Sequence, residues 1–349
     1  MANLLVTGGA GFIGGNFVHY WNAKHSEDRV IVLDALTYAG NRSTLEGTAA
    51  ELVVGDIRDT PLVESLLRDH AIDTLVHFAA ESHVDRSISG PDAFIDTNIL
   101  GTNSLLKAAR SVWLSGSGRP HRFHHISTDE VFGSLGPSDP AFSEITPYAP
   151  NSPYSASKAA SDHLVRAYHH TFGLEVTTSN CSNNYGPYQY PEKLIPLFLL
   201  NALHGRNLPI YGDGMNVRDW LHVEDHCRGI EACLANGKPG ETYNIGGGAE
   251  LPNLEVIAAI CREVDRAFAE VDGLAERYPD APAAKGEATE SLKTFVTDRA
   301  GHDRRYAIDE TKARAELGYV PAHDFDVGLR QTLRWYLDNE AWWRPLVKA

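Results

Sequence analysis

The chain has 349 residues, a length that fits one large domain or two modest ones. Its 31 basic and 46 acidic residues leave a formal net charge of −15, which repels nucleic acid and anionic membranes. We therefore expect neither as a partner. An anionic ligand must be held by a local group of Arg, Lys or backbone amides.

The cysteines and the apolar runs limit the class of protein further. Cys181, Cys227, Cys233 and Cys261 are widely spaced and form no C-x-x-C pair, so neither a disulfide framework nor a thiolate metal site is indicated. The N-terminus lacks the basic region of a signal peptide, and no apolar run reaches the roughly 18 residues of a membrane span. We expect a cytoplasmic protein.

Short β-rich runs alternate with stretches of helical length in the first half of the chain. The runs cover residues 3–7, 29–33, 51–55, 73–78, 122–127 and 175–180. This alternation predicts a Rossmann-type α/β fold, in which a doubly wound parallel sheet has helices on both faces. Beyond residue 180 come a predicted helix at 194–205 and turn-rich sequence, which indicate a smaller mixed α/β C-terminal lobe. Residues 270–295 are predicted to be an exposed insertion.

A glycine-rich turn, "TGGAGFIGG" at residues 7–15, follows the first predicted strand. Gly9, Gly11 and Gly14 fit the pattern G-x-G-x-x-G, while Gly8, Gly11 and Gly14 fit G-x-x-G-x-x-G. In either register the bare backbone lets a pyrophosphate approach the amides at a helix N-terminus. The alternative is a glycine-rich turn without a ligand.

Acidic residues at the ends of the next strands favour a dinucleotide. Asp34 ends the second strand 20 residues after Gly14, the separation expected for an acid that binds ribose hydroxyls. No Arg directly follows Asp34, so NAD is favoured over NADP. Asp56 and Ile57 follow the third strand and are placed to flank the adenine, although Asp56 taken alone reads as a strand-end cap. Residues 78–83 end the fourth strand beside the expected pyrophosphate path.

Two groups of residues indicate acid–base chemistry. Tyr154 and Lys158 are four residues apart, so on a helix they share one face, where an ammonium and an oxidised nicotinamide favour the tyrosine phenolate. Thr128, Asp129 and Glu130 end the fifth strand, where open α/β sheets build their sites. The alternatives are an accidental Tyr–Lys pair and a solvated acidic turn.

These motifs resemble those of the extended short-chain dehydrogenases/reductases, and within them the nucleotide-sugar dehydratases of the NAD-dependent epimerase/dehydratase family. Matching stretches span nearly the whole chain and include "TGGAGFIG", "FHHISTDEVFG", "YSASK" and "DRAGHDRRYAID". The carboxylate pair separates this group from the related 4-epimerases. Phe132 and Ala300 stand where Tyr and Pro are frequent, and neither departure removes a group that the chemistry needs.

The resemblance implies that dTDP-glucose is converted to dTDP-4-keto-6-deoxy-glucose. The steps are oxidation at C4, elimination of water across C5 and C6, and return of hydride to C6, with tightly bound NAD⁺ restored. Tyr154 is the base at the 4-hydroxyl, with Lys158 lowering its pKa and Thr128 bonding the same hydroxyl. Glu130 removes the C5 proton and Asp129 protonates the departing 6-hydroxyl. A homodimer and a place in deoxysugar biosynthesis, such as the rhamnose pathway, are also implied.

The same resemblance assigns residues to two parts of the chain. Residues 1–180, with a return segment near 217–246, are expected to bind NAD, and residues 181–216 and 247–349 the nucleotide sugar. The expected cofactor contacts are Gly8, Gly11, Phe12, Ile13, Gly14, Asp34, Leu36, Thr37, Asp56, Ile57, Ala79, Ala80, Ser82, Tyr154, Lys158 and Asn184. The expected substrate contacts are Ser82, Thr128, Asn183, Lys193, Arg218, Asn253 and His302.

Several alternatives remain open. Arg218 and the run 298–305 are the expected phosphate-binding cations, but a salt bridge with Asp219 and a solvated charged loop are the simpler interpretations. The rival functions are another nucleotide-sugar dehydratase, a UDP-sugar 4-epimerase and a non-catalytic NAD-binding sensor. An epimerase leaves Asp129 and Glu130 without a role. No metal is predicted, because "HVEDH" at 222–226 does not match H-E-x-x-H.

Overall fold

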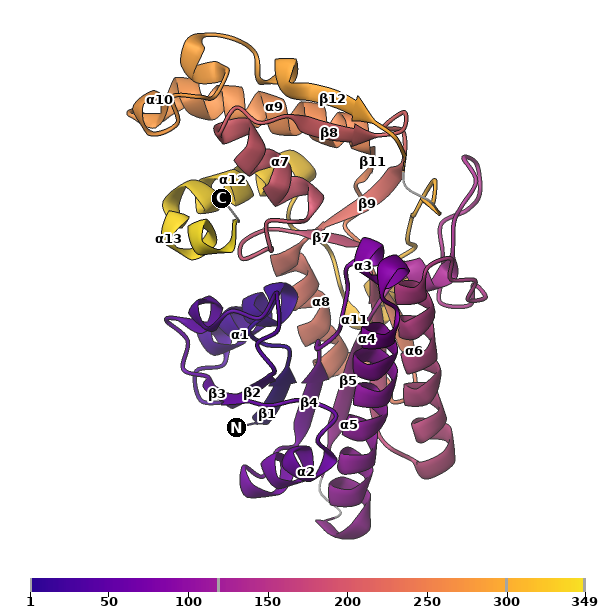
Figure 1. Cartoon of the computed structure of the whole chain (residues 1–349). Helices are drawn as coiled ribbons and strands as arrows, with labels where there is room; N and C mark the ends of the chain where they lie inside the picture. The colour runs from indigo at the N-terminus through magenta and orange to yellow at the C-terminus, as the bar shows by residue number, and fades with distance from the viewer. Residues whose placement is uncertain (1, 118–119, 299–300, 348–349) are drawn as a thin grey trace.

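A seven-stranded parallel sheet forms one half of the molecule, and the C-terminal elements pack above its upper end (Figure 1). This computed structural model describes residues 2–117, 120–298 and 301–347. The strand order is β10-β6-β5-β4-β1-β2-β3, which confirms the doubly wound Rossmann-type fold. The strands are β1 (Asn3–Thr7), β2 (Arg29–Asp34), β3 (Glu51–Val54), β4 (Thr74–His77), β5 (Arg122–Thr128), β6 (Val176–Cys181) and β10 (Thr242–Ile245).

Both faces of this sheet are buried under helices, because successive apolar residues of each strand point to opposite sides. Leu4 and Val6 of β1 pack with α1 (Phe12–Lys24) and α8 (Val223–Asn236). Leu5 packs on the other side, with α2, α5 and α6. The helices on that side are α2 (Thr60–Asp69), α5 (Thr102–Ala109) and α6 (Pro153–Phe172). The six strands predicted from sequence all lie in this sheet.

Helix α6 begins at a well-defined N-terminus next to the carboxyl end of β5. Ser152 is the N-cap: its Oγ accepts a hydrogen bond from the backbone N–H of Ser155, and the Ser155 side chain bonds back to the Ser152 N–H. Pro153 occupies the first turn, and Gly173, with a φ of 75°, ends the helix. This capping box fixes Tyr154 and Lys158 in the first two turns of the helix.

The connection between β4 and β5 is mostly helical. The segment before α5 is α3 (Val84–Ser89), α4 (Asp92–Phe94) and η2 (Ile95–Gly101), and η3 (Arg110–Ser117) follows α5; η2 and η3 have π-helical turns. Two short 3-10 turns complete this half, namely η1 (Arg42–Leu45) and η4 (Asp129–Phe132).

The C-terminal lobe contains two small sheets and a group of helices. One sheet has the order β11-β9-β7 and the other pairs β12 with β8. The strands are β7 (Asn183–Tyr185), β8 (Leu208–Tyr211), β9 (Val217–His222), β11 (Glu250–Pro252) and β12 (Lys293–Val296). The helices are α7 (Leu194–Leu203), α9 (Asn253–Glu270), α10 (Leu274–Arg277), η5 (Ala283–Lys285), η6 (Thr289–Leu292), α11 (Thr311–Leu317), α12 (Phe325–Asp338), α13 (Glu340–Trp343) and η7 (Arg344–Leu346).

The return segment 217–246 contributes a strand to each part of the molecule. β10 joins the large sheet beside β6, and β9 belongs to the three-stranded sheet of the C-terminal lobe. The description of 270–295 as an exposed insertion is wrong in part, since Leu274, Tyr278 and Ala281 are buried in the core formed with α7, α9 and α12. Its polar composition conceals these few apolar anchors.

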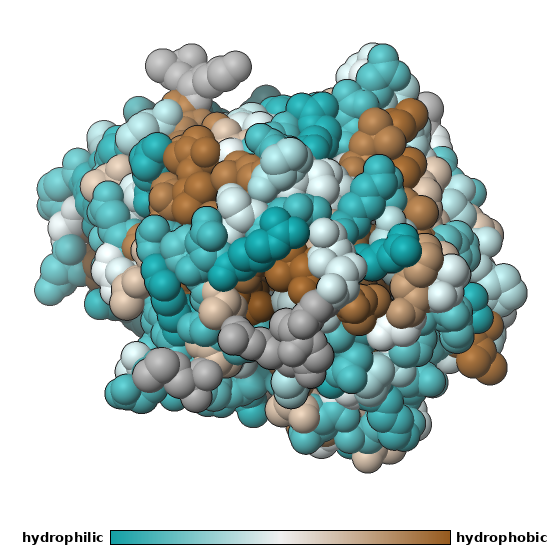
Figure 2. All heavy atoms as spheres, turned by 90° about the horizontal axis from the view of Figure 1, so that it is seen from below, coloured by the Kyte–Doolittle hydropathy of each residue, from teal (hydrophilic) through white to brown (hydrophobic). Residues whose placement is uncertain are grey.

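In the part of the chain that the structure describes, no helix combines the length and the apolar character that a membrane span requires. The face at the lower end of the molecule is mostly hydrophilic, with separate apolar patches (Figure 2).

Candidate active site

A cavity of about 390 Å³ lies at the carboxyl ends of the parallel strands, below the C-terminal lobe. Its walls come from the loops that follow β1 to β4, from the end of β5, from the start of α6 and from residues 181–184 and 189–193. Open α/β sheets bind ligands at this edge, where the connections diverge. Tyr154, Lys158, Thr128, Asp129 and Glu130 all line the cavity.

The glycine-rich turn presents bare backbone to one end of this cavity. Gly8 has a φ of +72°, and a Cβ there would lie 2.6 Å from the Ala79 backbone nitrogen. A Cβ on Gly11 would meet only the Gly8 carbonyl oxygen, at 3.3 Å, and would otherwise occupy the cavity itself. Gly11 is also the N-cap of α1 and offers no side-chain cap. The turn therefore leaves space and helix N–H groups for a diphosphate.

Asp34 is held rigidly at the end of β2. Its Oδ2 accepts a hydrogen bond from the Ala10 N–H at 2.9 Å, and its Oδ1 accepts one from the Leu36 N–H at 2.8 Å. Burial raises the pKa of this carboxyl despite the two donors. Each oxygen can accept a second hydrogen bond, so the group fits a ribose diol. Thr37 lines the cavity, whereas Leu36 contributes its backbone to Asp34 and is not part of the wall.

The other expected cofactor contacts lie along the same wall. Ile57 is buried there, and Asp56 lines the wall while it forms an ion pair with Arg58 at 2.7 Å. The hydrogen bond from Arg58 holds the pKa of Asp56 below its usual range. The remaining residues that line the cavity as expected are Phe12, Ile13, Gly14, Ala79, Ala80, Ser82 and Asn184.

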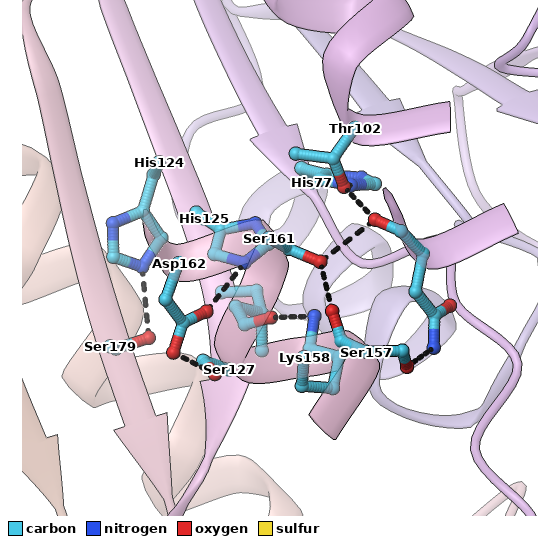
Figure 3. Close-up of polar contacts among 12 residues, drawn as sticks. His77, Thr102, His124, His125, Ser127, Ser157, Lys158, Ser161, Asp162 and Ser179 are labelled. Carbon is cyan, nitrogen blue, oxygen red and sulfur yellow. Dashed lines mark hydrogen bonds and ion pairs between the residues drawn. The ribbon is translucent and has the colours of Figure 1, made fainter. Parts of the chain in front are cut away.

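Tyr154 is almost buried, with 8% of its surface exposed. Burial, and next the charge of Glu130, raise its pKa well above the usual range, while a hydrogen bond with Thr128 opposes this. The sequence leads us to expect that Lys158 lowers this pKa. In the structure the Lys158 Nζ instead donates to the Ile126 carbonyl oxygen at 2.8 Å (Figure 3). The lowering by Lys158 stays a prediction for the cofactor-bound state.

Asp129 and Glu130 start the 3-10 turn η4 directly after β5. The Thr128 Oγ1 caps this turn by accepting the Glu130 N–H at 3.3 Å, which places both carboxylates at the end of the strand. Asp129 is 1% exposed, and its Oδ2 has no hydrogen-bond partner. Burial, and then Glu130, raise the pKa of Asp129 well above its usual range. A carboxyl in this environment keeps its proton and is suited to act as an acid.

The expected substrate contacts divide into two groups. Ser82, Asn183 and Lys193 line the cavity, and the Lys193 Nζ donates to the Ser82 carbonyl oxygen at 3.3 Å. Arg218, Asn253 and His302 do not line it. Each of the three lies in the C-terminal lobe or at its edge.

Arg218 is buried between polar and aromatic groups of the C-terminal lobe. Its guanidinium donates to the Asp303 carbonyl oxygen at 2.9 Å and lies 4.2 Å from the centre of the Tyr306 ring. The Asn253 Oδ1 is buried with no partner, and the His302 Nδ1 lies 2.7 Å from the Asp298 Oδ1. Arg299 and Ala300 of the run 298–305 lie outside the described residues.

Several residues of the site were not singled out from the sequence. Tyr38, Glu81 and Glu192 line the cavity, and Arg86 joins two of them: its guanidinium stacks 3.8 Å above the Tyr38 ring and donates to Glu192 at 3.0 Å. Asn98, far from any motif, bonds the Glu81 backbone on both sides. Glu81 and Glu192 lie in loops, each directly beside a residue that the sequence predicts to contact a ligand. This position next to predicted contacts is the signal in the sequence that points to them.

The prediction of no metal stays a prediction. Among the described residues, one group, His222, Glu224 and His323, places three donor atoms within 4.8 Å of one another. This group lies outside the cavity wall.

Comparison with known proteins places this site in a family. The model of the family described as GDP-mannose 4,6 dehydratase matches residues 5–332. A dTDP-glucose 4,6-dehydratase of Xanthomonas campestris pv. campestris (strain B100) is 56% identical, over 98% of this chain and 95% of the relative. A dTDP-glucose 4,6-dehydratase of Streptomyces venezuelae, crystallised with NAD, is 48% identical with a TM-score of 0.87, covering 99% of this chain and 100% of that one.

A more distant neighbour represents the rival function. A UDP-glucose 4-epimerase of Thermotoga maritima is 26% identical, with a TM-score of 0.82, and the match covers 97% of this chain and 99% of that one. The fold alone therefore does not separate dehydratases from epimerases, whereas the sequence identity does. The chain belongs to the dTDP-glucose 4,6-dehydratase family of the extended short-chain dehydrogenases/reductases.

Proposed function

We propose that this protein is a hydro-lyase that converts dTDP-glucose to dTDP-4-keto-6-deoxy-glucose with NAD retained and recycled. One observation supports this most directly. A buried carboxyl with a raised pKa, Asp129, adjoins a second carboxylate, Glu130, in the same cavity as the Tyr154–Lys158 pair. Removal of water from the sugar needs an acid and a base beside an oxidation site, and this cavity holds all three groups together.

The residues of the chain account for the proton transfers. Tyr154 accepts the proton of the 4-hydroxyl, which Thr128 orients by a hydrogen bond. The 4-ketone makes the C5 proton acidic, and Glu130 removes it. Asp129 gives its proton to the departing 6-hydroxyl, so that water leaves. A proton then returns to C5 when hydride is added at C6, which completes the 4-keto-6-deoxy product. Each acid or base group is worth roughly 10²- to 10⁴-fold in rate.

The cavity fits NAD at the end opposite the C-terminal lobe. The bare backbone of Gly11 leaves space for the diphosphate, while Gly8 and Gly14 let the turn pack closely against Ala79 and against itself. Asp34 is assigned to the adenosine ribose. Lys158 is placed for the ribose of the nicotinamide. When bound, NAD⁺ supplies the hydride acceptor for C4, the hydride that returns to C6, and a positive charge beside Tyr154.

The nucleotide sugar is assigned to residues of the C-terminal lobe, in the division set out from the sequence: 181–216 and 247–349 for the sugar nucleotide, and 1–180 with part of 217–246 for NAD. Asn183 and Lys193 contact the cavity directly. Arg218, Asn253 and His302 are assigned to the nucleotide end. The unpartnered buried Asn253 Oδ1 supports a ligand on that side.

A homodimer is part of the proposal. Ile88, Ile95 and Leu100 are about half exposed on α3 and η2, next to α6. Exposed apolar side chains on neighbouring helices are typical of an interface. The four cysteines are buried and unpaired, which supports a reducing location such as the cytoplasm.

The test is an assay of the purified protein with dTDP-glucose, UDP-glucose and GDP-mannose, with the products identified by mass spectrometry. The proposal expects loss of one water from dTDP-glucose, abolished in Tyr154→Phe, and release of NAD when the wild type is denatured. A 4-epimer of UDP-glucose with no loss of water would favour the epimerase instead.

A further inference from the structure

The mechanism leaves one buried carboxylate of helix α6 without a role. Asp162 is 6% exposed and lies four residues after Lys158, which itself lies four residues after Tyr154. Residues at this spacing share one face of a helix. The three side chains therefore form one row that begins at the cavity and ends beneath it.

Three donors hold the Asp162 carboxylate in place. Oδ1 accepts a hydrogen bond from the His125 Nε2 at 3.0 Å, and Oδ2 accepts from the Ser127 Oγ at 2.7 Å and the Tyr148 OH at 2.9 Å. Figure 3 shows Asp162 between His125 and Ser127 of β5. Burial keeps the pKa of His125 well below its usual range, so this imidazole is neutral. Burial raises the pKa of Asp162 to about 6, and the charge of Lys158 and the hydrogen bonds from Ser127 and Tyr148 oppose this rise, so the group is mainly an anion at pH 7.

Lys158 needs such a charge nearby. Its ammonium is buried and donates a hydrogen bond to a neutral group, the Ile126 carbonyl oxygen. A buried ammonium loses its proton unless an opposite charge compensates for burial. Other titratable groups surround Lys158 and Asp162. They are Tyr154 and His163 on α6, His77 on β4, His124 and His125 on β5, Cys181 on β6, and Tyr148 in the loop before α6.

Asp162 is the group in this set that provides the compensating charge. The imidazoles of His77, His124 and His125 have pKa values well below the usual range, and burial raises the pKa of Cys181 and Tyr148, so these five groups are uncharged at neutral pH. Burial lowers the pKa of Lys158, and the charge of Asp162 is the largest effect that raises it again.

We propose that the Asp162 carboxylate is the counter-charge of Lys158 and a positioning residue of the reaction, which keeps Lys158 protonated so that Tyr154 can accept the proton of the sugar 4-hydroxyl. This inference rests on the function proposed above. It assigns Ser127, Tyr148 and His125 the task of holding the anion.

Asp162→Asn tests the charge at almost constant shape. The Asn amide must donate where the carboxylate accepted, and His125 can adapt because its Nδ1 is buried without a partner. A change of tautomer moves the proton to Nδ1 and lets Nε2 accept. Asp162→Ser, smaller and neutral, is the second variant, and folding is checked by circular dichroism and thermal unfolding.

The first measurement does not depend on substrate. Acetic anhydride modifies only neutral amines, so the pH at which Lys158 becomes reactive, read by peptide mass spectrometry, reports its protonation. We expect this pH to fall by about one unit or more in D162N and D162S, the effect of removing a nearby opposite charge. Asp225→Asn removes a buried carboxylate elsewhere in the fold, one held by the Ala322 and His323 N–H groups, so this control should leave the pH unshifted.

The second measurement is the pH dependence of turnover of dTDP-glucose. The basic limb of kcat should move to lower pH in D162N by the same amount, with KM within about twofold of the wild type, whereas a purely structural defect lowers kcat equally at every pH. An unshifted Lys158 reactivity in D162N and D162S overturns the inference. If the Lys158 reactivity shifts but the wild-type protein does not turn over dTDP-glucose, the inference about Asp162 is supported and the proposed function is contradicted.

Discussion

Asp129 and Glu130 are consecutive in the chain, yet their surroundings differ: Asp129 is fully buried with Oδ2 unpartnered, whereas Glu130 is only partly buried. Burial and the neighbouring Glu130 charge keep Asp129 protonated. Two carboxyls with separated environments provide an acid and a base in one site. This asymmetry supports the proposed roles, in which Asp129 is the acid and Glu130 the base.

Substitution of Asp129 or Glu130 should block a later step of the reaction than substitution of Tyr154. Asp129→Asn and Glu130→Gln impair only the elimination, so both variants should form reduced nicotinamide on mixing with dTDP-glucose but release product roughly 10²- to 10⁴-fold more slowly. Tyr154→Phe should form none. Stopped-flow absorbance of the reduced cofactor measures this. Absence of reduced cofactor in D129N and E130Q would contradict their roles.

Gly8 and Gly173 offer a matched pair of glycines with nearly equal backbone angles. Their φ values are +72° and +75°, but a Cβ on Gly8 meets the Ala79 backbone at 2.6 Å and one on Gly173 meets nothing within 4 Å. Gly173→Ala should cost about 1 kcal/mol of stability and retain NAD. Gly8→Ala should lose the bound NAD, measured in the supernatant after denaturation. Equal NAD content in the two variants would argue against the turn as the diphosphate site.

Acid should destabilise the protein through its buried histidines. His124 is fully buried, bonds Thr177 and Ser179, and has a pKa well below the usual range because of burial. The unfolded chain binds a proton near pH 6.5 and the folded chain does not, so this contribution is lost as pH falls below that value. The stability advantage of the wild type over His124→Gln should therefore shrink by about 2 kcal/mol between pH 7 and 5 in urea unfolding. A constant difference would contradict a neutral His124.

The apolar side chains beside α6 should form the dimer contact. Leu100 is 51% exposed on η2, and Val320 is 54% exposed in the C-terminal lobe. Leu100→Glu places a charge in the expected interface and should give monomers in light scattering after size exclusion. Val320→Glu is the control and should remain dimeric. A wild-type monomer would remove this part of the proposal.

The sequence predicted the large sheet well because its strands are buried on both faces. Short continuous apolar runs such as residues 3–7 and 29–33 are typical of strands buried on both faces of a parallel sheet. The strands β1 and β2 match these two runs within one residue. The observed bounds of α6 agree with local signals, namely Ser152 and Pro153 at its start and Gly173 at its end. The site at the carboxyl ends of the strands followed from topology.

The remaining features depend on contacts between distant segments. The apolar anchors of residues 270–295 become visible only when α7, α9 and α12 form a surface for them. Arg86 of α3 reaches Tyr38 and Glu192 in two separate loops, and no spacing in the sequence indicates this. The contact of Lys158 with Ile126 likewise depends on how α6 packs on β5. Such arrangements follow from tertiary packing, which local patterns do not encode.

The most direct test of the account is incubation of the purified protein with dTDP-glucose in deuterated water without added NAD, followed by proton NMR and mass spectrometry. The account predicts a 4-keto-6-deoxy product with deuterium at C5, because Glu130 exchanges the C5 proton with solvent and retained NAD is recycled. Unchanged substrate even after NAD is added, or a 4-epimer formed without loss of water, would contradict it.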